Sequence, residues 1–189
     1  MYKDYTIAMF GTATEESSLT KPQPLHVLIE EGNELATFGA GCFWGVEEFF
    51  RKVQGVKRTQ VGYSGGEVVD PTYEQVCTGN SGHTEAIQME FDPREVSFSQ
   101  LLDIFWANHN PTTRDQQGPD IGSQYRSAIF FHNPSQKETA ELSKARLQES
   151  GVWGTRTIVT SIEQYTNFYP AEGYHQRYFE KRGGGTCHF

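Results

Sequence analysis

The residue best suited to chemistry in this sequence is a cysteine at position 42, within the segment 41–45, which reads Gly-Cys-Phe-Trp-Gly. An apolar run over residues 35–40 predicts a buried strand before it, and apolar residues recur at helical spacing over 46–53. Cys42 should therefore lie at a strand-to-helix turn, where backbone N–H groups stabilise a thiolate, the nucleophilic form of cysteine. The two aromatic residues would form a pocket beside it, and the flanking glycines would let the backbone bend. Cysteine and aromatic residues are also typical of a core, so the segment by itself fits a structural role equally.

Two further cysteines, Cys77 and Cys187, are far from Cys42 in the sequence. An odd number of cysteines argues against a static disulfide framework, and none has zinc-site spacing, so we expect no structural metal. Cys187 follows three glycines, residues 183–185, and a cysteine on such a flexible tail can reach a sulfur elsewhere. It is a candidate resolving thiol for an oxidised Cys42, and a tail cysteine without a role is the alternative.

Two carboxyl groups and two tyrosines could converge on Cys42. Glu85 begins an alternating segment that predicts a strand, and Asp120 lies in a polar loop that leads to Tyr125. A carboxylic acid in an apolar aromatic pocket has a raised pKa and donates a proton near neutral pH, while a tyrosine hydroxyl such as that of Tyr73 can bind a polar oxygen. Taken singly, each residue has an ordinary interpretation: a solvated strand-end charge, a turn former, or a half-buried aromatic side chain. Three histidines are interpreted in the same way as capping or packing residues: His83, His109 and His175.

A scaffold of strands and helices must position these residues. Strands are predicted over 35–40, 56–63, 85–91, 125–131 and 157–162. Helices are predicted over 46–53, after a cap at Ser97 or Ser99, from Asn133-Pro134 to about Ser150, and over 171–181. This order predicts one α+β domain, in which helices pack against a mixed sheet with a ferredoxin-like core, long loops and a flexible C-terminal tail.

Composition narrows the possible partners. The chain has 189 residues, which suits one domain, and a net charge of −8 without a basic cluster, so we expect neither nucleic acid nor a membrane as partner. No apolar run approaches the roughly 20 residues that span a bilayer, and no secretory signal begins the sequence, so we expect a cytoplasmic location. Neither G-x-G-x-x-G nor a P-loop is present, and we expect a monomer without a cofactor.

Several blocks of the sequence resemble one known family, the peptide methionine sulfoxide reductases of type A. The segment 41–45 matches the family signature, and further similar blocks follow in the same order: 73–79 with 82–85, 109–113, 117–127 and 171–176. The resemblance extends from Leu35 to Gln176 and into the glycine-cysteine tail, and it leaves the N-terminal extension outside. One departure is Asn110, which stands where the family pattern has Asp.

The resemblance implies reduction of the S epimer of methionine sulfoxide, free or in proteins. Cys42 would be the nucleophile and Glu85 the proton donor, and Cys42 would become a sulfenic acid that condenses with Cys187 to a disulfide. Thioredoxin would then reduce that disulfide. The corresponding domain division is an N-terminal extension at 1–33, a catalytic domain at 34–182 and a tail at 183–189.

The same resemblance assigns the substrate-binding residues. Phe43 and Trp44 would form the pocket for the substrate methyl group, and Tyr73 and Tyr125 would bind the sulfoxide oxygen. Asp120 would support the site, and His175 falls on a family site position. Cys77 lies in a block where cysteine is usual, and we expect it to be structural, with a secondary resolving role as the alternative.

Two other functions fit some of these residues. A thiol peroxidase or redox sensor could use Cys42 and Cys187 without needing an aromatic pocket. A non-catalytic module could bind methionine-containing peptides through Phe43 and Trp44. Substitution of Trp44 distinguishes a peroxidase from the reductase, because it should abolish methionine sulfoxide turnover and keep peroxide reactivity. A binding module, unlike the reductase, would consume no reductant.

Overall fold

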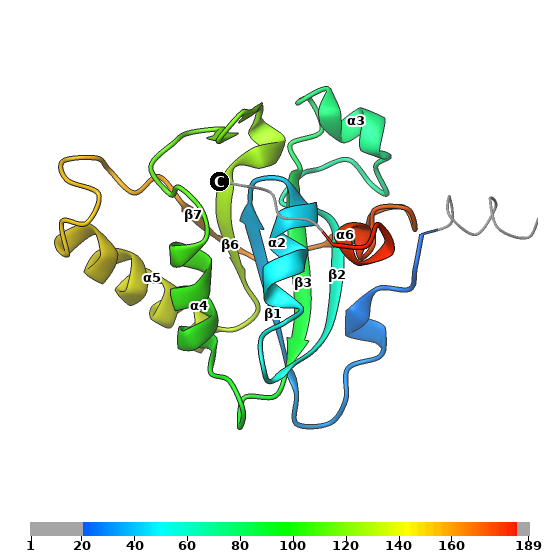
Figure 1. The fold of residues 1–189 in the computed structure, drawn as a ribbon, viewed down its shortest axis with the longest axis horizontal. Helices are drawn as coiled ribbons and strands as arrows, with labels where there is room; N and C mark the ends of the chain where they lie inside the picture. Colours follow the sequence, from blue (N-terminus) through cyan, green and yellow to red (C-terminus); the bar gives the residue numbers. More distant parts are fainter. Residues whose placement is uncertain (1–20, 185–189) are drawn as a thin grey trace, which may run out of the picture.

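The computed structural model describes residues 21–184 and shows a six-stranded sheet with helices packed against it (Figure 1). The strands of this sheet are β1 (Glu34–Ala40), β2 (Val56–Ser64), β3 (Thr84–Phe91), β6 (Ser127–Phe131), β7 (Ser161–Gln164) and β8 (Phe168–Pro170). Their order is β7-β6-β1-β3-β2-β8, and every neighbouring pair is antiparallel except β6 with β7. A second, two-stranded sheet pairs β4 (Gln116–Gln117) with β5 (Asp120–Ile121).

The α-helices of the described residues are α2 (Phe43–Phe50), α3 (Tyr73–Cys77), α4 (Phe98–Ala107), α5 (Pro134–Glu149) and α6 (Tyr178–Lys181), and two 3-10 turns are η1 (Leu25–Val27) and η2 (Ser123–Tyr125). The succession β1-α2-β2-β3-α4-β6, with the strand order β6-β1-β3-β2, is that of a ferredoxin-like core. The predicted α+β class is therefore confirmed.

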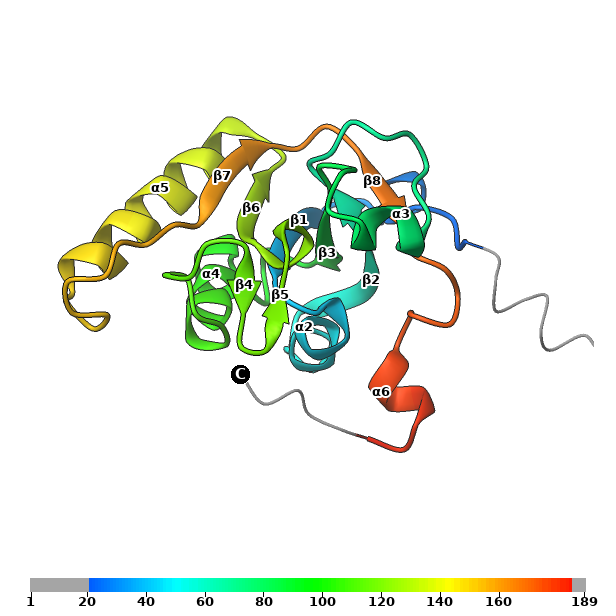
Figure 2. The ribbon, with the colours of Figure 1, turned by 90° about the horizontal axis from the view of Figure 1, so that it is seen from above.

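Helices α2 and α4 cover the same face of the sheet (Figure 2). Phe38 of β1 lies between them, with ring centroids 5.6 Å from Phe50 of α2 and 5.0 Å from Phe105 of α4. All three side chains are fully buried, and each such burial contributes roughly 1.5–3 kcal/mol. Ser97, rather than Ser99, caps α4, in a capping box with Gln100.

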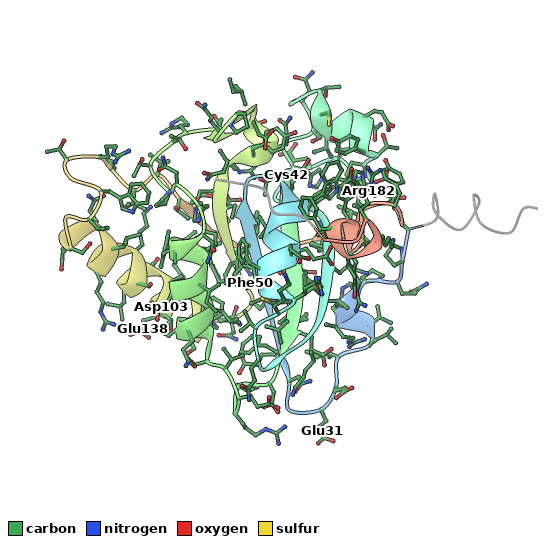
Figure 3. The ribbon with its side chains drawn as sticks, in the orientation of Figure 1. Glu31, Cys42, Phe50, Asp103, Glu138 and Arg182 are labelled. Carbon is green, nitrogen blue, oxygen red and sulfur yellow. The ribbon has the colours of Figure 1, made fainter. Side chains whose placement is uncertain are left out.

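The strand register brings several strand ends to the end of the sheet where α2 begins. Ala40, the last residue of β1, pairs with Ser127 at the start of β6. Tyr63, near the end of β2, pairs with Glu85 near the start of β3. Because β1 and β3 are antiparallel neighbours, the turn after β1 lies beside Glu85. Figure 3 shows Cys42 at this end of α2 and Phe50 at the other.

Two predicted strands are shorter than expected. The segment 157–160 is not a strand, since Ile158 N–H donates to the Gln148 side chain and Val159 N–H to the Pro111 carbonyl, and β7 begins only at Ser161. Strand β6 begins at Ser127, because Tyr125 belongs to the 3-10 turn η2. The β-branched residues of 157–162 predicted a strand over that whole segment, but the hydrogen-bond partners of Ile158 and Val159 lie in other segments.

The predicted helix 171–181 is also wrong over its first part. Only Tyr178–Lys181 is helical, and Arg177 before it has a left-handed backbone with φ 51°. The Gln176 side chain bonds both the N–H and the carbonyl of Val61 in β2, which holds the segment 171–177 against the sheet edge. The short helix α3 was not predicted, because its five residues are too few to show a helical period.

Residues 1–20 and 185–189 lie outside the described residues, and the predicted tail cysteine, Cys187, is among them. Part of the N-terminal extension is described, and its residues contact the domain. Leu25 is buried, Gln60 of β2 donates to the Gln23 carbonyl, and Glu90 of β3 accepts from Asn33. Within 21–184, no helix is long and apolar enough to cross a membrane.

Candidate active site

Cys42 lies at the strand-to-helix turn that the sequence predicts. It is the N-cap residue of α2, directly after Gly41, and its side chain is half-buried. Gly41 has φ +88°, and a Cβ there would lie 2.6 Å from Cγ of Gln117, so both the backbone conformation and the close approach require glycine. Gly45, in contrast, lies inside α2 and is buried, so only one of the two flanking glycines shapes the turn.

Glu85 points its carboxyl group at this turn. Phe43 N–H, in the peptide that follows Cys42, donates to Glu85 Oε2 at 3.0 Å. The side chain is buried, and this burial raises its pKa from 4.5 to about 8, with the nearby charge of Asp120 contributing and the Phe43 hydrogen bond opposing. The Glu85 carboxyl group is therefore uncharged at neutral pH, and it is hydrogen-bonded to the residue that follows Cys42.

Two tyrosines and an aspartate interact electrostatically with the same carboxyl group. Burial raises the pKa of Tyr125, and the charges of Glu85 and Asp120 raise it further, with smaller contributions from Cys77 and Cys42. Burial likewise raises the pKa of Tyr73, so both phenols keep their protons and remain hydrogen-bond donors. The interaction with the Cys77 thiol raises the pKa of Tyr73 further.

Aromatic rings form the other side of the site. Phe43 is buried against Tyr63, and Trp44 is half-buried with Tyr178 stacked on it at a centroid distance of 3.8 Å and an angle of 4°. His175 contacts Phe43 and Trp44 with ring centroids at 5.1 and 5.6 Å. Burial lowers the pKa of His175 to about 4, so its ring is neutral at pH 7.

The family model described as peptide methionine sulfoxide reductase matches residues 34–189. The chain belongs to this family. It is 57% identical over 158 residues to peptide methionine sulfoxide reductase MsrA of Methanoculleus marisnigri, covering 84% of this chain and 96% of that protein. MsrA of Geobacter metallireducens is 53% identical over 156 residues, covering 82% and 96%. The predicted family membership and the predicted oxidoreductase class are therefore confirmed.

Solved structures of similar proteins agree with the fold. Reduced Mxr1 of Saccharomyces cerevisiae superposes with a TM-score of 0.78 at 35% identity, covering 84% of this chain and 91% of that one. Methionine sulfoxide reductase A of Corynebacterium diphtheriae gives a TM-score of 0.74 at 36% identity, covering 84% and 79%. A third structure holds Mxr1 in complex with Trx2, with a TM-score of 0.57 at 27% identity, covering 79% and 88%.

Three residues at this candidate site escaped sequence reasoning. Glu172 accepts the Tyr63 hydroxyl at 2.9 Å and the Tyr73 backbone N–H at 3.1 Å. Tyr178 covers Trp44. Glu172 lies three residues before His175 within a block that resembles the family, and this spacing was a signal for a paired role. Tyr63 and Tyr178 carry no comparable local signal.

The remaining chemically interesting residues have structural partners. Nδ1 of His109 lies 2.7 Å from the Phe105 carbonyl and Nε2 lies 2.7 Å from Ser127 Oγ, which fits the packing role expected for this histidine. Asn110 Oδ1 accepts from both the backbone and the hydroxyl of Thr112. These bonds need only an acceptor oxygen, which Asp also provides, so the departure at this position leaves the turn intact.

Cys77 ends α3 and is exposed. Desolvation of its sulfur raises the thiol pKa, against the lowering effect of the Tyr73 hydrogen bond. A thiol with a raised pKa is a poor nucleophile, which favours the structural role over the resolving one. Among the described residues, no group of three or more His, Cys, Asp or Glu side chains could hold a metal ion.

Proposed function

We propose that this chain reduces the S epimer of methionine sulfoxide, free and in proteins, to methionine. The observation that carries the proposal is the buried, uncharged Glu85 carboxyl group bonded to the peptide that follows Cys42. It puts a proton donor and a nucleophile at one turn, which the reduction of a sulfoxide by a thiol requires.

In the first step the Cys42 thiolate attacks the sulfoxide sulfur while Glu85 gives its proton to the sulfoxide oxygen. The oxygen ends on the Cys42 sulfur as a sulfenic acid, and methionine leaves with its sulfur reduced by two electrons. Tyr125 and Tyr73 donate hydrogen bonds to the oxygen, and Asp120 holds the polar side of the site. Proton transfer of this kind contributes about 10²–10⁴-fold to the rate.

In the second step Cys187 condenses with the sulfenic acid, which releases water and forms the Cys42–Cys187 disulfide. A thioredoxin then exchanges its dithiol for this disulfide and restores both thiols. Support comes from the three glycines before Cys187 and from the solved structure in which Mxr1, a similar protein, is in complex with Trx2. In this scheme residues 34–182 form the catalytic domain, 183–189 the resolving tail and 1–33 an extension.

Selection of one epimer follows from three points of contact around a tetrahedral sulfur. The methyl group lies against Phe43 and Trp44, the oxygen lies on the phenols, and Cys42 approaches from a third direction. Exchanging the methyl group and the oxygen would place the oxygen against apolar rings without a hydrogen-bond partner, at a cost of about 1–3 kcal/mol or more. The family resemblance assigns the accepted epimer as S.

We further propose that the enzyme acts as a monomer in the cytoplasm and repairs oxidised proteins. A reducing compartment keeps cysteines as thiols, which this reaction cycle needs before each turnover. Its net charge of −8 gives no attraction to anionic lipid or nucleic acid.

The test is NADPH oxidation with thioredoxin and thioredoxin reductase, using the separate S and R epimers of a blocked methionine sulfoxide. We expect turnover of S only for the wild type. Cys187→Ser should stop turnover with thioredoxin and keep it with dithiothreitol. Turnover of neither epimer by the wild type would refute the reductase function and favour a peroxidase. A Cys187→Ser variant that still turns over with thioredoxin would refute only the resolving role.

A further inference from the structure

Gln117 is a buried glutamine that lies against the turn of Cys42 and that the proposed mechanism does not use. It is the last residue of β4, and it is 3% exposed. A Cβ added to Gly41 would lie 2.6 Å from Cγ and 2.7 Å from Cβ of Gln117. The apolar stem of this side chain therefore packs directly on the backbone that precedes the nucleophile.

The amide group of Gln117 fixes that stem in place. Its Oε1 accepts from the Asn110 backbone N–H at 2.9 Å, and its Nε2 donates to the Asn110 carbonyl at 3.2 Å. A primary amide is suited to this contact because it offers a donor and an acceptor side by side. The preceding residue, His109, is bonded to the Phe105 carbonyl and to Ser127 Oγ. Gln117 is thus attached to a loop that is itself anchored to α4 and β6.

Gln117 also belongs to the hairpin that carries the aspartate of the site. It pairs directly with Asp120 across β4 and β5. Residues directly opposite each other in an antiparallel pair have their side chains on the same face. The charge of Asp120 acts on Glu85, and the Glu85 carboxyl group accepts from Phe43 N–H. The interactions form a closed ring, in which the packing of Gln117 on Gly41 joins the hairpin to the turn.

We propose that Gln117 is a positioning residue that sets the place of the Cys42 sulfur relative to Glu85. Its stem supports the turn at Gly41, and its amide holds the stem. This inference rests on the proposed function, because it takes Cys42 as the nucleophile that attacks the sulfoxide. A displacement of about 1 Å between reacting groups can slow a reaction about 100-fold, so a contact at this turn is able to control the rate.

The matched test compares Gln117→Met, which keeps an unbranched stem and loses the amide, with Gln117→Ala, which loses both. We expect the single-turnover rate of methionine formation from the S epimer to fall about 3–10-fold in Gln117→Met and about 30–100-fold in Gln117→Ala. KM should change less than the rate, because a side chain that is 3% exposed acts through the turn rather than on the substrate.

Gln116→Ala is the control from the same hairpin, since the Gln116 amide bonds the Gly118 carbonyl at the hairpin tip. It should stay within about twofold of the wild type. A Gln117→Ala rate within threefold of the wild type would overturn the proposal, and so would an equal loss in Gln116→Ala.

A double-mutant cycle tests the contact between Gln117 and Gly41. In the wild type, Gly41→Ala places a methyl group on the Gln117 stem, whereas in the Gln117→Ala background that space is open. Gly41→Ala should therefore lower both the single-turnover rate and the urea midpoint less in the Gln117→Ala background. A cost remains in both backgrounds, because residue 41 keeps its φ of +88°. Equal losses in the two backgrounds would refute the contact.

An activity-free measurement separates this inference from the proposed function. Hydrogen exchange of the Phe43 amide, followed by NMR, reports on the turn because that N–H bonds Glu85. Met89, in the middle of β3 between β1 and β2, reports on global unfolding. Exchange at Phe43 should quicken about tenfold in Gln117→Ala relative to Met89, and it should not change in Gln116→Ala.

The two hypotheses can then fail separately. If the wild type makes no methionine, the reductase function fails, while the exchange at Phe43 still decides whether Gln117 supports the turn. Unchanged exchange at Phe43 in Gln117→Ala would refute the positioning role even in an active reductase.

Discussion

Glu85→Gln is the substitution that tests the chemistry of the site most directly. The Gln amide is nearly isosteric, its oxygen can still accept from Phe43 N–H, and it has no acidic proton. With a pKa of about 8, Glu85 is protonated in about nine molecules of ten at pH 7. An ordinary carboxyl group, with its pKa at 4.5, would be protonated in about three of a thousand. Burial therefore increases the available acid about 300-fold.

We expect Glu85→Gln to slow methionine formation by about 10²–10⁴-fold in single-turnover experiments with the S epimer. The wild-type rate should fall as the pH rises through about 8, where Glu85 loses its proton, and the residual rate of the variant should lack this limb. Glu95→Gln, which changes an exposed carboxylate paired with Lys57, is the control and should leave both rate and profile unchanged. A Glu85→Gln rate within threefold of the wild type would refute the reasoning.

The same pKa predicts an effect of Glu85 on stability. A carboxyl group with a raised pKa binds more protons in the folded than in the unfolded state between pH 4.5 and about 8, so stability falls as the pH rises through this window. At pH 7 the free energy of unfolding has fallen by at most about 3 kcal/mol from its value below pH 4.5. In urea unfolding, the free energy of unfolding of Glu85→Gln should therefore rise relative to that of the wild type from pH 5 to pH 8. A difference between the two that does not change with pH would contradict the buried-acid interpretation.

Three further substitutions test the surroundings of the site. Gly41→Ala should cost about 1–3 kcal/mol in urea unfolding and lower activity, because it combines φ +88° with a steric clash; Gly118→Ala, with φ +55° and open space, should cost only about 1 kcal/mol, and equal costs would contradict the clash. Tyr178→Ala should raise KM for the S epimer severalfold by uncovering Trp44, whereas Tyr178→Phe keeps the stack and should resemble the wild type; equal KM values would exclude the stack from substrate binding. Cys77→Ser should keep thioredoxin-supported turnover within about threefold, and loss of turnover with thioredoxin but not with dithiothreitol would instead assign it a resolving role.

Much of the fold could be predicted from local patterns. The apolar run over 35–40 and the helical spacing over 46–53 predicted β1 and α2, and Cys42 lies between them as expected. Helix α2 begins and ends three residues earlier than predicted. Ser97 with Gln100 is a capping box readable from the sequence. Such features are determined by residues within a few positions of each other, so no knowledge of the rest of the chain is needed.

Local sequence patterns did not predict the conformation of residues 157–160 and 171–177. Ile158 bonds a glutamine in α5, and Gln176 bonds the backbone of β2, in each case instead of continuing a local helix or strand. Competition between a local preference and a distant partner is decided by which bond the folded chain can form, and that requires the tertiary structure.

The candidate site likewise has features that the sequence indicates and features that only the folded structure determines. The types and order of its residues, including Cys42, Glu85 and His175, could be selected from the sequence together with the family resemblance. What makes Glu85 an acid is its burial beside Phe43, and what makes His175 an acceptor is the indole N–H of Trp44. A pKa and a tautomer depend on desolvation and on partners that are 42 and 131 positions apart in the chain, so only the folded structure determines them.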